Sequence, residues 1–209
     1  MVQKIKTIKL YHGDIPKNLN LGNSIAIDTE TMGLNITNDR LCLVQISSGN
    51  GECHIIKFKK EKYNAINLKK ILEDKSILKI FHFARFDVAV IKKYLQVNCS
   101  PIYCTKIASK IARTFTNRHG LRDLCKNLLK IDNNKQNQTS DWGNDELTED
   151  QVSYAATDVL YLHEIKNKLD KMLKREGREY LADACFKFLP IRSDFDLIGW
   201  QDKDIFEHE

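Results

Sequence analysis

The sequence predicts a single α/β domain, residues 1–209, in which a mixed sheet is flanked by helices. Short apolar runs rich in β-branched residues dominate the first half of the chain, and helical periodicity dominates the second half. Between them, an apolar run is followed directly by a helical pattern. Alternating strands and helices of this kind build layered α/β domains. The length of 209 residues is sufficient for one core without a disulfide or a structural metal.

The predicted strands are short apolar runs bounded by turn residues. They cover Ser24–Asp28, Leu41–Ser48, Glu52–Phe58 and Ile77–Phe81. The turn Ser48-Gly49-Asn50-Gly51 between the second and third runs is typical of a β-hairpin. We therefore expect the first three strands to be antiparallel.

The predicted helices are segments in which apolar residues recur with a period of about 3.6. They cover Tyr63–Asp74, Phe83–Leu95, Thr105–Ala112, Leu121–Leu129, about Glu149–Arg175, and Glu179–Phe186. Thr148 and Gln151 form a capping-box pattern at the start of the long helix. Residues 131–140 are expected to form a polar loop, and residues 189–209 an irregular but apolar tail.

Composition limits the class of protein without defining it. The net charge of +5 suits a polyanionic partner but does not by itself indicate one. None of the six cysteines belongs to a CxxC pair, which argues against a zinc site. No run approaches the roughly 20 apolar residues that span a bilayer, and no secretory signal is visible. We expect a cytoplasmic protein with no membrane partner.

Two carboxylates, Asp28 and Glu30, end the first predicted strand. Side chains two apart on a strand point to the same face, so these two project together. Their mutual repulsion is costly at the end of a buried strand unless a cation neutralises it. Taken alone, the pair more often marks a solvated turn after the strand.

Three further residues extend the acidic pair. Asp87 lies in the first turn of the helix after Ile77–Phe81, where it could also simply complement the helix dipole. Tyr154 and Asp158 are four residues apart on the long helix and share a face. Four carboxylates suit Mg²⁺ or Mn²⁺. Two such ions about 3.5–4 Å apart can activate water and stabilise the leaving oxygen of a phosphodiester.

The combined pattern resembles the Tyr-containing branch of the DEDD exonuclease superfamily. Residues 140–162 resemble ribonuclease D, and a similarity to the nanoRNase C family of compact alphaproteobacterial oligoribonucleases extends over nearly the whole chain. The segments that carry this second similarity are Ile80–Asp87, Tyr103–Lys110, Arg118–Leu121 and Phe188–Trp200. The chain does not depart from the superfamily pattern at its five core positions.

The resemblance implies a ribonuclease H-like fold and two divalent cations, Mg²⁺ or Mn²⁺. The implied metal ligands are Asp28, Glu30, Asp87 and Asp158, and Tyr154 is implied to orient the attacking water. The implied activity is release of 5′-mononucleotides from the 3′ ends of short single-stranded RNA, down to dinucleotides, by a homo-octamer. Residues 182–209 are expected to form a C-terminal extension that packs on the core or at a subunit interface.

Substrate contacts are expected at residues 31–34, at the end of the fourth strand, and on the polar loop. In similar exonucleases the residue at Leu34 wedges between the terminal bases; the alternative is a loop leucine that covers the sheet. The other candidates for substrate binding are Thr31, Gly33, His82, Lys135 and Ser140. His82 could equally be a buried, hydrogen-bonded histidine. Lysine and polar groups on a loop before a helix favour phosphate.

Three other functions compete with this interpretation. A general ribonuclease D-like enzyme would act on longer RNA. A DNA 3′-end exonuclease would share the site, since the sequence contains no evident device for sensing the 2′-hydroxyl. A non-catalytic nucleic-acid-binding module would use the same pocket without cleavage, which the intact set of five residues disfavours.

Overall fold

The computed structural model describes residues 7–132 and 141–208, and within these ranges the strands form one six-stranded sheet. The strands are β1 (Thr7–His12), β2 (Ser24–Thr31), β3 (Leu41–Ser47), β4 (Glu52–Lys57), β5 (Leu78–Phe81) and β6 (Ile102–Cys104). Their order in the sheet is β1-β4-β3-β2-β5-β6. The antiparallel arrangement expected for β2, β3 and β4 is confirmed, while β1, β5 and β6 each pair in parallel.

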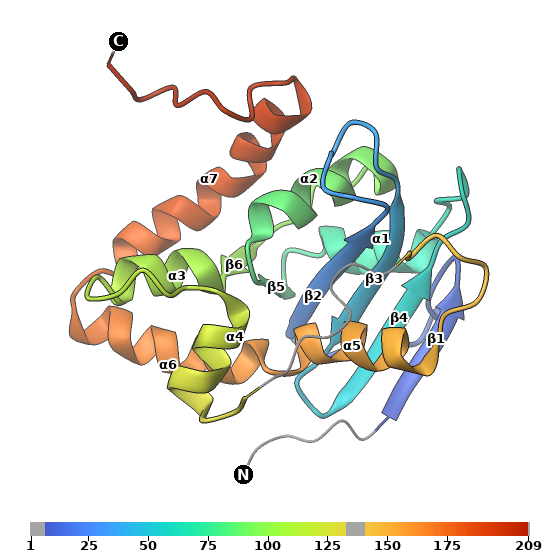
Figure 1. Ribbon diagram of the computed structural model, residues 1–209, viewed down its shortest axis with the longest axis horizontal. Coiled ribbons are helices and arrows are strands. Elements are labelled where there is room, and N and C mark those ends of the chain that lie inside the picture. Colours follow the sequence, from blue (N-terminus) through green and yellow to red (C-terminus); the bar gives the residue numbers. More distant parts are fainter. Residues whose placement is uncertain (1–6, 133–140, 209) are drawn as a thin grey trace.

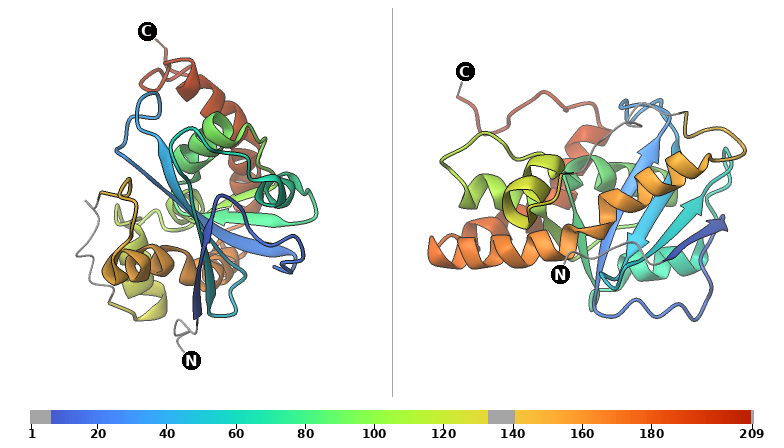
Figure 2. Two further views of the ribbon diagram at one scale, coloured as in Figure 1. Left: turned by 90° about the vertical axis from the view of Figure 1, so that its right-hand side faces the viewer. Right: turned by 60° about the horizontal axis from the view of Figure 1, so that its bottom comes forward.

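Helices cover both faces of this sheet (Figure 1). They are α1 (Ile66–Glu73), α2 (Ala84–Leu95), α3 (Thr105–Ala112), α4 (Leu121–Leu124), α5 (Glu149–Leu160), α6 (Leu162–Arg175) and α7 (Glu179–Leu197), with a π-helical turn η1 (Cys125–Leu129) after α4. The left view in Figure 2 shows α5 on one side of the sheet and α1 and α2 on the other. The predicted layered α/β architecture is therefore confirmed.

Two strands were not predicted from the sequence. β1 is a largely exposed edge strand whose residues alternate between lysine, threonine and apolar side chains, so it lacks an apolar run. It is held by parallel pairing with β4, from Thr7↔Glu52 to His12↔Lys57. β6 has only three residues and follows Pro101, so its pattern is too short to recognise. Both strands depend on pairing with distant segments, which local sequence does not report.

The single long helix expected from about Glu149 to Arg175 is wrong, because the helix breaks at Tyr161. α5 contacts β1 to β4, whereas α6 packs mainly on α3. Because of the break, α5 packs on the sheet while α6 packs on a neighbouring helix. The predicted capping box is confirmed: the Thr148 hydroxyl accepts from the Gln151 amide at 3.2 Å, and the Gln151 side chain accepts from the Thr148 amide at 2.9 Å.

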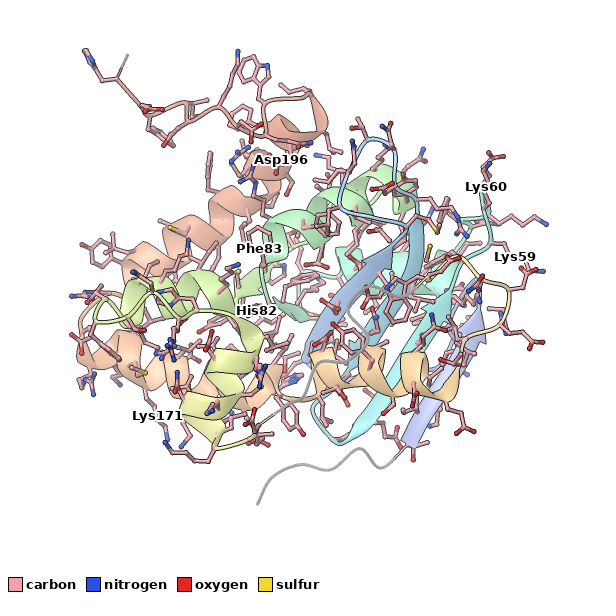
Figure 3. The ribbon with its side chains drawn as sticks, viewed as in Figure 1. Lys59, Lys60, His82, Phe83, Lys171 and Asp196 are labelled. Atoms are coloured by element: carbon pink, nitrogen blue, oxygen red, sulfur yellow. The ribbon has the colours of Figure 1, made fainter. Side chains whose placement is uncertain are left out.

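The irregular tail expected for residues 189–209 is wrong in its first part, because α7 continues to Leu197 with Pro190 inside it. The buried residues of α7 recur at helical spacing, but the last two, Ser193 and Asp196, are polar. The apolar periodicity that predicts a helix therefore ends before the helix does. The Asp196 carboxylate accepts two hydrogen bonds from Arg85 of α2, both at 2.7 Å. Figure 3 shows Asp196 near the end of α7 that lies beside α2.

Two predicted features fall partly or wholly outside the described residues. The candidate phosphate ligands Lys135 and Ser140 lie in the segment 133–140, as does most of the expected polar loop.

In the described ranges, which include all six cysteines, none of them forms a disulfide bond. None of the helices in these ranges is both long and apolar enough to cross a bilayer.

Candidate active site

Three of the predicted carboxylates meet where α5 crosses β2. Asp28 and Glu30 are half-buried on the same face of β2, and Asp158 projects from α5 with 8% of its surface exposed. One ligand oxygen from each lies within 4.8 Å of the others. The β2–β3 register shifts between Glu30 and Thr31, so regular pairing ends beside the cluster. An all-carboxylate set of this spacing suits a hard divalent cation such as Mg²⁺ or Mn²⁺.

Asp87 lies outside this group of three. It is 4% exposed in the first turn of α2, and its carboxylate accepts a hydrogen bond from the Thr29 hydroxyl at 2.7 Å. Burial raises the pKa of Asp87, and the charge of Asp158 raises it further, so the fourth carboxylate is within electrostatic reach of the cluster. Sequence reasoning did not identify Thr29, although its position between Asp28 and Glu30 directs it to the face that α2 covers.

Tyr154 lies one helical turn before Asp158. Burial raises the pKa of its hydroxyl. The negative charges of Asp158 and Glu30 raise this pKa further, as does a hydrogen bond with Asp158. The hydroxyl therefore remains protonated at neutral pH. The ring of Trp142, which is 3% exposed, lies 6.0 Å from the Tyr154 ring and limits its movement. This environment makes the hydroxyl a hydrogen-bonding group for orientation and a poor proton acceptor.

The loop at residues 32–40, which follows β2, places Leu34 at the surface, where the residue is 87% exposed. Two side chains of helix α2 anchor this loop by hydrogen bonds to its backbone. The Lys93 ammonium donates to two successive loop carbonyls, the first at 2.9 Å, and the Tyr94 hydroxyl donates to the carbonyl of Asp39 at 3.1 Å. An exposed leucine on an anchored loop cannot be explained by core packing.

Thr31 and Gly33, the other two candidates in this segment, have internal contacts. The Thr31 hydroxyl donates to the carbonyl of Gly33. A Cβ atom on residue 33 would collide with the carboxylate of Asp39, which itself caps the loop by accepting from the Asn35 amide at 2.8 Å. Both residues shape the loop that carries Leu34, and their predicted contact with substrate remains a prediction.

His82 and Phe83 link β5 to α2 and lie near each other in the centre of Figure 3. The Thr105 hydroxyl donates to the Phe81 carbonyl at 3.0 Å, so its oxygen accepts from Nδ1–H of His82, 2.9 Å away. This assigns the His82 proton to Nδ1 and directs Nε2 as an acceptor. Phe83 has a left-handed φ of 67° and is 45% exposed, with the Lys106 ammonium 4.2 Å from its ring centroid.

A second loop, residues 141–147, enters α5 and is tied to the sheet. The Lys57 ammonium donates to the carbonyls of Asn144 and, at 2.7 Å, Asp145. The Arg40 guanidinium donates to the Gly143 carbonyl at 3.2 Å. These contacts fix the position from which α5 presents Tyr154 and Asp158.

The mixed sheet, with acidic side chains at the end of a central strand and on a crossing helix, defines a nuclease of the ribonuclease H-like class. The family model described as 3′-5′ exonuclease matches residues 5–174. The chain therefore belongs to the 3′-5′ exonuclease family, a family of phosphodiester hydrolases.

Curated relatives fall in two groups. DNA polymerase I of Aquifex aeolicus is 32% identical over 176 residues, which cover 82% of this chain and 29% of that protein. Ribonuclease D of Gluconacetobacter diazotrophicus is 30% identical over 154 residues, which cover 74% of this chain and 39% of that protein. The chain thus spans less than half the length of either relative.

Among solved structures, Brucella melitensis NrnC matches over nearly the full chain. The identity is 50%, the TM-score is 0.94, and the match covers 97% of this chain and 100% of that one. The same Brucella protein has been solved with bound Mg²⁺ and bound to pGG, at 48% and 50% identity and TM-scores of 0.93 and 0.94; these matches cover 97% of this chain and 100% and 99% of those chains, respectively. The expected resemblance to ribonuclease D and nanoRNase C is therefore confirmed.

Proposed function

We propose that this chain is a divalent-metal-dependent 3′→5′ exoribonuclease that releases 5′-mononucleotides from short RNA, down to dinucleotides. The observation that carries the proposal is the meeting of Asp28, Glu30 and Asp158 beside a protonated Tyr154. Family membership supplies the reaction class, and the Mg²⁺ and pGG complexes of the Brucella protein support the cation and the short substrate.

The donor set fits two divalent cations. Asp28, Glu30 and Asp158 are spaced for one shared centre, and Asp87 lies close enough for the charge of Asp158 to raise its pKa. Asp87 would complete the set by exchanging its bond to Thr29 for a cation. When bound, the two ions supply charge that lowers the pKa of a water and stabilises the leaving oxygen.

The side chains of the chain itself position the reactants. Tyr154 orients the attacking water by hydrogen bonding, since its hydroxyl stays protonated. His82, which is held through Nδ1 by the Thr105 hydroxyl, is proposed to contact a sugar hydroxyl of the substrate. Leu34 projects from its anchored loop to separate the last two bases.

The direct test is product analysis with a 5′-labelled dinucleotide and a 5′-labelled ten-residue RNA. We expect Mg²⁺-dependent, chelator-sensitive release of mononucleotides from the 3′ end, with a higher kcat/KM on the dinucleotide. Asp28→Asn should abolish release while the protein stays folded. Cleavage at saturating Mg²⁺ by this variant at a near-normal rate would show that the metal assignment is wrong.

The wedge role of Leu34 has its own test. Leu34→Ala should lower kcat/KM on a dinucleotide about 10-fold, in line with the loss of a buried aliphatic contact. Hydrolysis of thymidine 5′-monophosphate p-nitrophenyl ester, which has no second base, should not change. Equal losses on both substrates would assign Leu34 to the integrity of the site.

We further propose that residues 182–209 make a subunit contact in a homo-octamer. α7 packs on α2 of its own chain, but the segment after it remains exposed and apolar, and Figure 1 shows it extending away from the core. Ile198, Trp200, Ile205 and Phe206 are 62%, 40%, 47% and 79% exposed. Several exposed apolar side chains on one short segment indicate a contact surface. Light scattering should give an octamer mass; a monomer mass for the intact chain would refute this.

A DNA 3′-end exonuclease is the second candidate, because one relative is a DNA polymerase I. The discriminating experiment compares an RNA dinucleotide with its deoxy counterpart at equal Mg²⁺. Equal or faster cleavage of the deoxy substrate would favour this alternative.

A further inference from the structure

Gln45 stands out in strand β3 as an amide within an otherwise apolar run, LCLVQIS. Its side chain is fully buried, with 0% exposed. Across residues 7–132 and 141–208, neither Oε1 nor Nε2 of Gln45 has a hydrogen-bond partner. Buried amides without partners are costly and uncommon, so the position calls for a partner that the working enzyme supplies.

The sheet register puts Gln45 directly beside the carboxylate cluster. Gln45 pairs with Asp28 on the antiparallel β2 strand, so their side chains share one face. On its other side Gln45 pairs with Ile55 of β4, which offers no polar group. Helix α5 crosses β2, β3 and β4. The amide therefore lies next to Asp28 in a layer that α5 closes.

The charge of Asp28 affects a second side chain in this layer, the thiol of Cys53. Burial raises the pKa of Cys53 on β4, and Asp28 is the charged group that raises it further. Facing side chains of an antiparallel pair have Cβ atoms about 4.5–5.5 Å apart. A glutamine side chain spans that distance, so Nε2 can reach an oxygen of Asp28 by a rotation about its own bonds.

We propose that Gln45 is a positioning residue that donates its Nε2–H to the Asp28 carboxylate when divalent cations occupy the site; this rests on the proposed function. A carboxylate that would hold a cation must keep one orientation, and partners behind metal ligands commonly supply it. A neutral amide does so without neutralising the charge that attracts the cations. Lysine at this position would compete with them.

The test compares Gln45→Met with wild type and with Leu43→Met. Leu43 is a fully buried residue of the same strand and the same face, opposite Glu30, and its replacement conserves volume without removing a polar group. Mn²⁺ affinity is measured by electron paramagnetic resonance, and thermal unfolding is measured in chelator. Mn²⁺ reports on the site independently of turnover.

Gln45→Met should weaken Mn²⁺ binding about 10–100-fold. In chelator its unfolding midpoint should rise by about 2–4 °C, because an amide without a partner is removed. Leu43→Met should leave Mn²⁺ affinity unchanged. At saturating Mg²⁺ the kcat of Gln45→Met should recover most of the wild-type value. The high Mg²⁺ concentration fills the metal site even though the Asp28 carboxylate is no longer held in one orientation.

The opposite pattern would overturn the inference. A lower midpoint in chelator with unchanged Mn²⁺ affinity would make Gln45 a structural amide that is satisfied by an internal water. Failure of the proposed function is distinguishable, because then the wild-type protein itself would show no Mn²⁺ binding and no metal-dependent cleavage.

Discussion

Neutralising Asp158 should stabilise the metal-free protein and remove its response to Mg²⁺. The three carboxylate oxygens lie within 4.8 Å of one another. At that separation and an effective dielectric constant of about 20, each pair of charges repels by about 3.5 kcal/mol. Asp28 and Glu30 are half-exposed, and solvent reduces this to about 1 kcal/mol per pair. Asp158→Asn removes two pairs, so the expected gain is about 2 kcal/mol, or about 4–8 °C in Tm.

The assay is thermal unfolding of wild type and Asp158→Asn in chelator and over a Mg²⁺ series. In chelator the variant should melt higher. With Mg²⁺ at about 100 times its Kd the wild type should gain about 2.7 kcal/mol, whereas the variant should gain little. The order of the two Tm values should therefore reverse. A variant that melts lower in chelator and still responds to Mg²⁺ would refute the placement of Asp158 in a repulsive, cation-binding cluster.

Three other predictions address neighbouring features. Tyr154→Phe should lower kcat about 10²-fold with unchanged Mn²⁺ affinity; an unaffected rate would remove the hydroxyl from the mechanism. Asp196→Ala leaves Arg85 without its buried partner and should lower the free energy of unfolding by about 2–4 kcal/mol in urea titrations. Burial lowers the pKa of His163 below 6.5, so the unfolded state binds its proton first and wild-type stability should fall as the pH drops below that value. His163→Gln should show a smaller loss between about pH 7.5 and pH 5.5, and an identical loss would contradict the assignment.

Much of the fold was predictable because its central elements follow simple periods. β2 and β3 are apolar runs, and the turn at Ser48–Gly51 fixed their neighbour β4 as antiparallel. Edge elements were less predictable. β1 is exposed and polar, and its strand character comes from pairing with β4, a contact between residues far apart in sequence.

The C-terminal helix illustrates a second limit. Pro190 and the polar residues Ser193 and Asp196 argue locally against a continuing helix. The helix persists because its polar residues are satisfied by α2: the Ser193 hydroxyl lies 3.3 Å from the Arg85 carbonyl, and Asp196 pairs with the Arg85 guanidinium. A helix face that is held by hydrogen bonds at Ser193 and Asp196 shows no apolar periodicity in the sequence.

The meeting of the candidate carboxylates could be predicted from the sequence, but the residues packed around them could not. Asp28, Glu30 and Asp158 meet as expected. Thr29 and Gln45 went unnoticed, because a threonine in a strand and a single glutamine in an apolar run carry no functional signal alone. Only the register of β2 with β3 shows that Gln45 faces Asp28.

The way the loops are anchored explains how the geometry of the carboxylate cluster is held. Lys57 and Lys93 fix the loops on either side of the site, and both donate to backbone carbonyls. The position of α5 is set at its first turn, where Gln151 closes the capping box and its Nε2 donates to the carbonyl of Asp141 at 3.1 Å. Lys57 and Lys93 thus contribute to the geometry of the site through backbone carbonyls. Moving a lysine onto one of the site carboxylates would stabilise the protein and weaken its affinity for metal.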